Sequence, residues 1–310
     1  MDNSRKGTAR NRLWKYAPLY LMMAPGIVYL LINNYLPMFG LAIAFKDVNY
    51  AKGIWGSDWV GIQNFKFLFQ SSDAYVITRN TILYNAAFIV IGLFVGIGLA
   101  ILLNEIKNKI AVKFYQSIIL LPYLISMVLV SYLVYSLLSV NSGLMNNTIL
   151  PALGIDPISW YNEPKYWPFI LVIVNVWKGA GYSCIIYLAS IISIDPEYYE
   201  AAKLDGASKW QQIRLITVPL ITPVVIMLTL LQIGRIFYSD FGLFYQVPMN
   251  SGALFETTNV IDTYVFRGLM QLGDIGMSSA AGLYQSFVGF VLVILSNYLV
   301  RKINKDNALL

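Results

Sequence analysis

Six apolar stretches, each long enough to cross a lipid bilayer, constrain the fold of this 310-residue chain more than any other feature. A helix that spans the bilayer needs roughly 20 mainly apolar residues. Pro18, Pro25 and Pro37 indicate that the first stretch is bent, or that it begins and ends inside its apolar limits. We therefore expect an all-α integral membrane protein with six transmembrane helices, whose approximate bounds are 16–45, 80–103, 114–139, 166–194, 216–238 and 275–300.

Composition supports a membrane protein and gives no sign of catalysis. Charged residues make up 12% of the chain, about half of the roughly 25% that is usual in a soluble domain. The chain has no histidine, which is the commonest general base and metal ligand. Its one cysteine, Cys184, lies inside an apolar run, so neither a disulfide nor a thiolate metal site is expected. It also lacks a GxxxxGK[ST] phosphate-binding loop.

Lysine and arginine are distributed unevenly between the two sides of the expected membrane. If the N-terminus is cytoplasmic, the cytoplasmic segments hold fourteen of these residues and the outer loops hold six. This bias predicts that both termini are cytoplasmic, with a basic tail at 1–15, a permease domain at 16–300 and a second tail at 301–310. The net charge of +6 is then explained by membrane topology, and no nucleic-acid partner is expected.

A polar segment interrupts the apolar runs after the fourth expected span. Asp195 and Pro196 are typical of a helix start, and Gly206 stands where a glycine would end that helix. Ser208 and Gln211 have capping-box spacing, so a second short helix is expected to begin at once. We call this helix–turn–helix segment, residues 195–218, the elbow. Pro219 is expected to end its second helix or to kink its continuation.

The elbow resembles the EAA loop of permeases from binding-protein-dependent ABC importers. The resemblance lies in the Glu200-Ala201-Ala202 triplet, then Gly206, then Ile216 and Pro219, with Val218 where leucine is usual. In that family the loop is cytoplasmic and docks into a groove on the ATPase subunit. The resemblance implies the type I importer fold and assigns ATPase coupling to Glu200, Ala201, Ala202, Asp205, Gly206, Ile216 and Pro219.

Several outer segments are similar to the complex-carbohydrate branch of the sugar permeases. They are FGLAIAFKD, WVGIQNF, NVIDTYVFRGL and SSAAGLYQS, with a loop after the third span that begins SGLMNN. This resemblance implies a non-catalytic subunit in the cell membrane that forms half of a pore for an oligosaccharide. The implied partners are a second, homologous permease in a heterodimer, two ATPase subunits that use ATP and magnesium, and an extracellular substrate-binding lipoprotein. No cofactor is expected on this chain itself.

Two charges lie in or near the expected spans, where ionisable residues are costly and often functional. Lys178 lies near mid-depth of the fourth span, and Arg235 lies near the outer end of the fifth. Aromatic rings can pack on sugar C–H faces while amide and cationic groups donate to hydroxyls. The expected substrate-path residues are therefore Trp177, Lys178, Tyr182, Gln232, Arg235 and Tyr238.

Each of these residues also has a purely structural interpretation. Arg235 could extend to the interface or pair with Asp240, and Lys178 could bind backbone carbonyls or a partner's carboxylate. The aromatic residues could serve in packing or in an interfacial belt. If the substrate neutralises Lys178, the cargo should be acidic, because an unpaired buried ammonium is costly.

Alternative functions are less well supported. Ser183 lies five residues from Lys178, a spacing that does not bring the two together as a hydrolase dyad. Gly92, Gly96 and Gly98 lack the strand context of a dinucleotide fingerprint, and we expect them to allow close helix contact instead. A type I permease for a non-sugar solute remains an alternative, as does a channel or secondary carrier, although no acidic relay is visible in the spans.

Overall fold

The computed structural model describes residues 16–66 and 72–303, and it is a helical membrane protein. The expected tail at 1–15 and the last residues, 304–310, lie outside this range. Among the described residues, five helical segments are long and apolar enough to span a membrane, or six if a bent pair counts as one span. The five are Ala17–Phe45, Asp73–Asn104, Pro164–Ile192, Lys209–Ile233 and Ile275–Lys302, and the bent pair is Lys109–Leu124 with Met127–Leu138.

The first span changes helix type twice along its length. An α-helix, α2 (Ala17–Leu30), continues as a π-helical turn (Leu31–Tyr35) and then as a 3-10 helix (Leu36–Phe45). The 3-10 part packs against the last helix, α15 (Ile275–Ile303). No residue of α2 is buried, so this half of the span makes little contact with the rest of the chain.

A small hairpin follows the first span and was not expected from the sequence. Strand β1 (Lys46–Asp47) pairs antiparallel with β2 (Asp58–Trp59), and the short helix α3 (Gly53–Gly56) lies between them. The buried ammonium of Lys46 closes the hairpin by donating to the carbonyl oxygens of the α3 residues Ile54 and Trp55. A 3-10 turn (Gln63–Phe65) completes this segment.

The centre of the molecule is a pair of long helices, α5 (Ser72–Asn104) and α9 (Trp167–Ile192), which pack along each other. A Cβ at Gly96 would lie 3.0 Å from the Cβ of Ser183, so the expected close contact exists at this glycine. It does not exist at Gly92 or Gly98, where a Cβ would meet nothing within 4 Å. Within the described part of this chain the prediction is wrong for these two, because the space beside each glycine is open.

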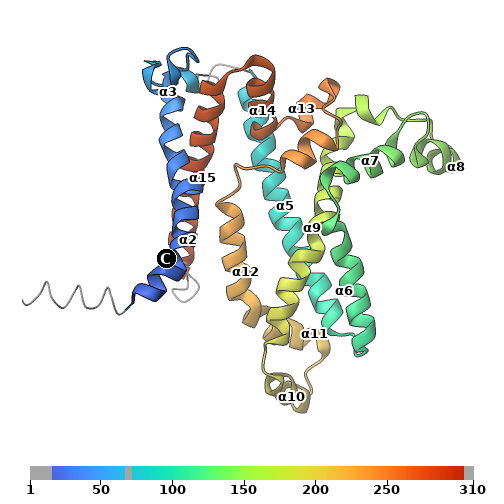
Figure 1. Cartoon of the computed structure of the whole chain (residues 1–310). Coiled ribbons are helices and arrows are strands. Elements are labelled where there is room, and N and C mark those ends of the chain that lie inside the picture. Colours follow the sequence, from blue (N-terminus) through green and yellow to red (C-terminus); the bar gives the residue numbers. More distant parts are fainter. Residues whose placement is uncertain (1–15, 67–71, 304–310) are drawn as a thin grey trace, which may run out of the picture.

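The third apolar stretch is broken, although the sequence predicted one span at 114–139. Helix α6 (Lys109–Leu124) and helix α7 (Met127–Leu138) meet at an angle of 96°. Ser126 caps the start of α7, where its hydroxyl accepts a hydrogen bond from the amide of Leu129 at 3.4 Å. Figure 1 shows α7 running sideways from the upper end of α6 towards α8 (Leu150–Ala152).

The segments on either side of α8 are short helical turns that cover one end of the bundle. They are Met145–Ile149, Trp160–Asn162 and Pro164–Tyr166. Together with residues 243–260 they enclose the largest apolar cluster, at the ends of α5, α7 and α9. Its large buried members include Trp160, Trp167, Leu171, Leu243, Phe244 and Leu254.

The elbow lies at the opposite end of the bundle and leads directly into the fifth span. Helix α10 (Pro196–Leu204) is followed by α11 (Lys209–Gln212), a π-helical turn (Ile213–Thr217) and α12 (Val218–Ile233). These last three form one continuous 25-residue helix, so Pro219 does not end the second elbow helix. Pro219 lies inside this helix, and the wider π turn at Ile213–Thr217 directly before it accommodates the proline without ending the helix.

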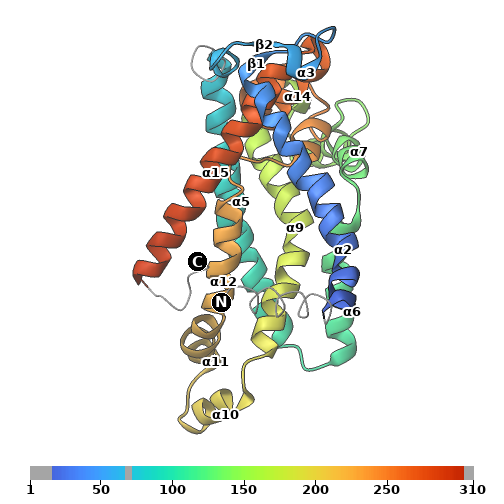
Figure 2. The same ribbon diagram turned by 60° about the vertical axis from the view of Figure 1, so that its left-hand side comes forward.

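The remaining segments return the chain to the bundle. After α12 they are a π turn (Gly242–Gln246), a 3-10 turn (Gly252–Leu254), α13 (Phe255–Thr258), α14 (Ile261–Leu272) and α15. The start of α2 and the end of α15 point towards the same end of the bundle as the elbow, whereas the hairpin and α14 lie at the other end (Figures 1 and 2).

Candidate substrate cavity and coupling elbow

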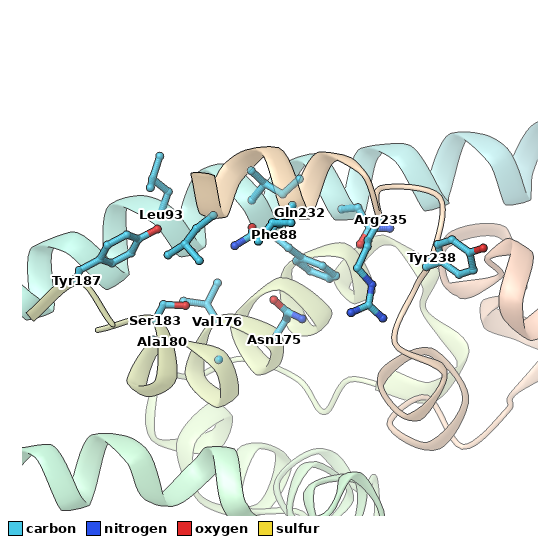
Figure 3. Close-up of a pocket in the computed structure, with 16 residues that line it drawn as sticks. Phe88, Leu93, Asn175, Val176, Ala180, Ser183, Tyr187, Gln232, Arg235 and Tyr238 are labelled. Atoms are coloured by element: carbon cyan, nitrogen blue, oxygen red, sulfur yellow. The ribbon is translucent and has the colours of Figure 1, made fainter. Parts of the chain in front are cut away.

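Three helices enclose a cavity of about 400 Å³ in the middle of the bundle. Figure 3 shows its lining side chains, which come from α5, α9 and the C-terminal part of α12 with the turn that follows it. The lining residues are Asn85, Phe88, Ile89, Gly92, Leu93, Asn175, Val176, Gly179, Ala180, Ser183, Tyr187, Leu228, Leu231, Gln232, Arg235 and Tyr238.

The structure brings together only half of the predicted substrate-path residues. Gln232, Arg235 and Tyr238 line the cavity. Trp177, Lys178 and Tyr182 do not, because they lie on parts of α9 that face α6 and α7. Trp177 lines a separate apolar cavity of about 300 Å³ between α7 and α9, and Tyr182 stacks on Tyr123 of α6 with ring centroids 4.9 Å apart.

Among the residues that the structure describes, Arg235 supplies the one formal charge in the lining of this cavity. Within residues 16–66 and 72–303 its guanidinium makes no hydrogen bond or ion pair. The suggested pairing with Asp240 is wrong, because the Asp240 carboxylate accepts the amide of Leu243 at 3.0 Å instead. The donors of Arg235 are therefore available to a ligand in the cavity.

Neutral polar groups surround this cation. In the described part of the chain, the side chains of Asn175, Ser183 and Gln232 also have no hydrogen-bond partner. Figure 3 shows Asn175 on α9 opposite Gln232 and Arg235 on the α12 side. The rings of Phe88 and Tyr238 add apolar surface. Such a lining can bind a carboxylate and several hydroxyls, and it offers no carboxylate or metal-ligating cluster of its own.

The sequence did not identify Asn85, Asn175 or Ser183 as cavity residues. Each is a single uncharged polar residue within an apolar helix, a pattern that also fits a structural role. Asn85 does have such a role, since its amide donates to the carbonyls of Thr81 and Ile236, both at 2.9 Å. Only the packing of α5 against α9 and α12 reveals which of these residues share a cavity.

Lys178 is fully engaged with backbone oxygen atoms at the end of α6. Its ammonium donates to the carbonyls of Pro122 at 3.3 Å and Tyr123 at 3.1 Å, and also to that of Ile125. The structural alternative for this lysine is thus correct. The premise that Lys178 is unpaired is wrong, so this residue gives no argument for an acidic cargo.

The elbow has the local geometry that its sequence predicted. The Asp195 carboxylate accepts the amide of Glu197 at 3.0 Å, and Gly206 has the positive φ of 78° that ends α10. The reciprocal capping box of Ser208 and Gln211 is present at the start of α11. The Tyr199 hydroxyl also lies 2.9 Å from that of Thr217, so the two arms are joined into one unit.

The residues assigned to ATPase coupling lie mostly on the open side of the elbow. Glu200, Ala201, Asp205, Gly206 and Pro219 are exposed, whereas Ala202 and Ile216 are half-buried. The same surface carries apolar side chains that contact little, including Leu204, which is 90% exposed, together with Tyr198 and Trp210. Exposed apolar groups around a charged motif are typical of a protein-binding surface.

One ion pair connects the elbow to the central helices. The Lys209 ammonium on α11 lies 2.7 Å from the carboxylate of Glu105, which directly follows α5. Both residues, with Glu200 and Lys203, line a second cavity of about 340 Å³ between the elbow and the ends of α5 and α9.

Comparison with known proteins identifies the family. The family described as "Binding-protein-dependent transport system inner membrane component" matches residues 74–305. This chain belongs to that family of ABC importer permeases. It is therefore a multi-pass inner-membrane subunit without a catalytic site, and a partner ATPase handles ATP.

The permease is similar over most of its length to proteins named for polysaccharide transport. It is 36% identical to the Bacillus subtilis polygalacturonan/rhamnogalacturonan transport system permease protein YteP, over 93% of this chain and 89% of that one. It superposes with a TM-score of 0.87, at 34% identity, on a chain of a bacterial ABC transporter involved in the import of the acidic polysaccharide alginate. That match covers 96% of this chain and 99% of the other.

A relative with a different named cargo is more distant. The trehalose/maltose transport system permease protein MalF of Thermococcus litoralis is 28% identical, over 95% of both chains.

Proposed function

We propose that this permease forms half of the transmembrane path of an ATP-driven importer for acidic oligosaccharides, and that Arg235 binds a carboxylate of the cargo. The observation that carries the proposal is the guanidinium of Arg235, which has no partner among residues 16–66 and 72–303 and lies in a cavity whose other described polar groups are uncharged. Hydrogen bonds between a guanidinium and a carboxylate are charge-assisted and often bidentate.

The remaining lining suits the neutral parts of a sugar. Asn175, Gln232 and Ser183 offer donors and acceptors for hydroxyl groups, and Phe88 and Tyr238 offer ring faces for C–H surfaces. The proteins named above for polygalacturonan and alginate, at 36% and 34% identity, support an acidic cargo. The trehalose/maltose permease MalF and the lactose permease LacF of Rhizobium radiobacter, both 28% identical to this chain, are named for neutral sugars. Uptake of neutral oligosaccharides without any preference for acidic ones is therefore the contrasting outcome of the test.

The same proposal includes the assembly and its orientation. The elbow, with Glu200, Ala201, Ala202, Asp205, Gly206, Ile216 and Pro219, docks on one of two ATPase subunits in the cytoplasm, where both termini also lie. A second permease completes the pore, and an extracellular binding lipoprotein delivers the sugar. A solved alginate transporter in complex with its sugar-loaded periplasmic protein, which matches this chain with a TM-score of 0.86, supports that delivery route.

Uptake by the complete reconstituted transporter tests the cargo. Labelled oligogalacturonates are compared with the same oligomers after their carboxyl groups are reduced, in wild type and in Arg235→Gln. A hydrogen bond to a charged group contributes about 1.5–3 kcal/mol, so the preference for the acidic form should fall about 10- to 100-fold in the variant. Arg301→Gln, at the exposed end of α15, is the matched control and should keep the wild-type preference. A wild-type protein without preference, or one unchanged by Arg235→Gln, contradicts the proposal.

A further inference from the structure

The turn that carries Arg235 is irregular and depends on side chains for its shape. After α12 ends at Ile233, the backbone forms turns that are closed by hydrogen bonds between residues three apart. The amide of Arg235 donates to the Gln232 carbonyl at 3.0 Å, and the amide of Tyr238 donates to the Arg235 carbonyl at 2.8 Å. Because the helix has stopped, the next carbonyls along the chain need partners from elsewhere.

Two side-chain amides supply those partners. The Gln285 amide of α15 donates to the Phe237 carbonyl at 2.6 Å, and the Asn85 amide donates to the Ile236 carbonyl at 2.9 Å. Gln285 is only 5% exposed, so the free energy cost of losing this donor is not offset by water.

A carboxylate completes the arrangement. The same Gln285 amide donates to an oxygen of Asp262 on α14 at 3.2 Å, and that oxygen also accepts the backbone amide of Ser239 at 2.8 Å. Gln285 and Asp262 therefore hold the stretch from Phe237 to Ser239 at both of its ends. Figure 1 shows that α14 and α15 reach this region from outside the α5–α9–α12 group.

Packing fixes the turn against α15 on its other sides. The Phe237 ring is buried and lies edge-on to Tyr284, with ring centroids 5.7 Å apart. One helical turn after Gln285, Gly289 meets the start of the turn, where an added Cβ would lie 2.6 Å from the carbonyl oxygen of Gly234. The backbone of Arg235 is thus held on both sides, while its guanidinium has no partner among the described residues.

We infer that Gln285 is a positioning residue for cargo selection: it fixes the turn that aims Arg235 into the cavity. The inference rests on the proposed function of Arg235. Since no described residue binds the guanidinium, its place in the cavity is set by the backbone that Gln285 holds. A displacement of a binding group by about 1 Å is enough to weaken ligand binding substantially.

The test measures cargo preference in Gln285→Leu, which keeps much of the side-chain volume and removes both hydrogen bonds. The preference for acidic over carboxyl-reduced oligosaccharides should fall at least fivefold through a higher KM for the acidic form, with little change in uptake of the neutral form. Asp262→Asn is the matched control, because an amide oxygen can still accept both bonds, and it should keep the wild-type preference. An equal loss for both cargoes, as expected of a merely structural residue, overturns the inference.

A double variant separates this inference from the proposal on which it rests. If Gln285 acts through Arg235, adding Gln285→Leu to Arg235→Gln should leave the preference of Arg235→Gln unchanged. An additive loss shows that Gln285 acts elsewhere, even when Arg235→Gln behaves as proposed. If Arg235→Gln itself has no effect, the proposed function fails first. Should Gln285→Leu not reach the membrane, Gln285→Asn, with its shorter amide, is judged by the same outcomes.

Discussion

The ammonium nitrogen of Lys178 lies 3.1 Å from the carbonyl oxygen of Tyr123, at the point where α6 ends within an apolar stretch. The last carbonyls of a helix have no partners within it and carry the negative end of its dipole. Lys178 satisfies this end with a cation, and the chain can then turn through 96° into α7. A charged residue within one span, α9, thus stabilises the point at which the neighbouring helix α6 ends and the chain bends.

Replacement of Lys178 by methionine should destabilise the subunit for every cargo. It removes the ammonium donor from the Tyr123 and Ile125 carbonyls, whereas the Pro122 carbonyl still accepts the amide of Ile125. The loss costs about 1–3 kcal/mol. Thermal unfolding in detergent should occur at a lower temperature, and uptake of acidic and neutral oligosaccharides should fall by the same factor. Lys113→Met, at an exposed position of α6, is the control. A selective loss of acidic cargo would instead assign Lys178 to the substrate.

Gly206→Val should uncouple ATP hydrolysis from transport while the subunit remains in the membrane. The φ of 78° at Gly206 is unfavourable for a β-branched residue by roughly 1–3 kcal/mol, so the link between α10 and α11 must change. Gly206→Asn should be nearly normal, because asparagine tolerates this conformation. The measurements are binding-protein-stimulated ATPase activity and uptake. Normal coupling in the valine variant contradicts a role for elbow geometry.

Swapping the charges of Lys209 and Glu105 should show whether this ion pair transmits motion from the elbow to the central helices. Both side chains are substantially exposed, so the pair stabilises the fold by no more than about 1 kcal/mol. Glu105→Lys should lower the ratio of uptake to ATP hydrolysis by up to about fivefold with little change in thermal stability. The double variant Glu105→Lys with Lys209→Glu should recover most of that ratio. If the double variant does not recover the ratio of uptake to ATP hydrolysis, the two residues act individually and not through their ion pair.

The stability of wild type should fall more steeply than that of Asp262→Asn between acidic and neutral pH. Burial raises the pKa of the Asp262 carboxyl, although hydrogen bonds from Ser239 and Gln285 oppose the shift. Between the ordinary pKa of aspartate and the raised one, the Asp262 carboxyl is therefore still protonated in the folded state but has lost its proton in the unfolded state. The free energy of unfolding falls as pH rises from the ordinary pKa of aspartate through the raised one. Unfolding temperatures from pH 4 to pH 7 should show this fall in wild type and a weaker one in Asp262→Asn. Parallel curves contradict it.

Cysteine labelling tests the proposed orientation. Cys184 is buried, so background labelling by a membrane-impermeant maleimide should be low. Lys203→Cys, on the elbow, should react only after the membrane is opened, and Asn250→Cys should react in intact cells. The reverse pattern would place the elbow outside and remove its contact with a cytoplasmic ATPase.

The sequence predicted what depends on local chemistry and missed what depends on packing. The limits of α10, the capping box at Ser208 and the turn at Gly206 follow from neighbouring residues, and the structure has all three. The break after Leu124 has a local cap at Ser126, but the carbonyls that it exposes are bound by Lys178, more than fifty residues away in the sequence.

The cavity shows the same division. Arg235 stood out because a charge near the end of a span is rare. Asn175 did not, since a lone amide in a helix gains meaning only when the facing helices are known. The role of Gln285 was equally hidden, because its partners lie on α14 and in the turn after α12.

Arg235, the one charged residue that the described part of this chain places in the cavity lining, also bears on how the membrane potential acts during transport. A monoanionic sugar bound at Arg235 makes the loaded cavity electrically neutral, whereas the empty cavity keeps one elementary charge. Moving one such charge through 100 mV changes the free energy by about 2.3 kcal/mol. For an importer of anions built in this way, the loaded step is insensitive to voltage. The electrical work of bringing a negative charge into a cell with a negative interior is then done in the step that returns the empty, positively charged cavity to its outward-facing state.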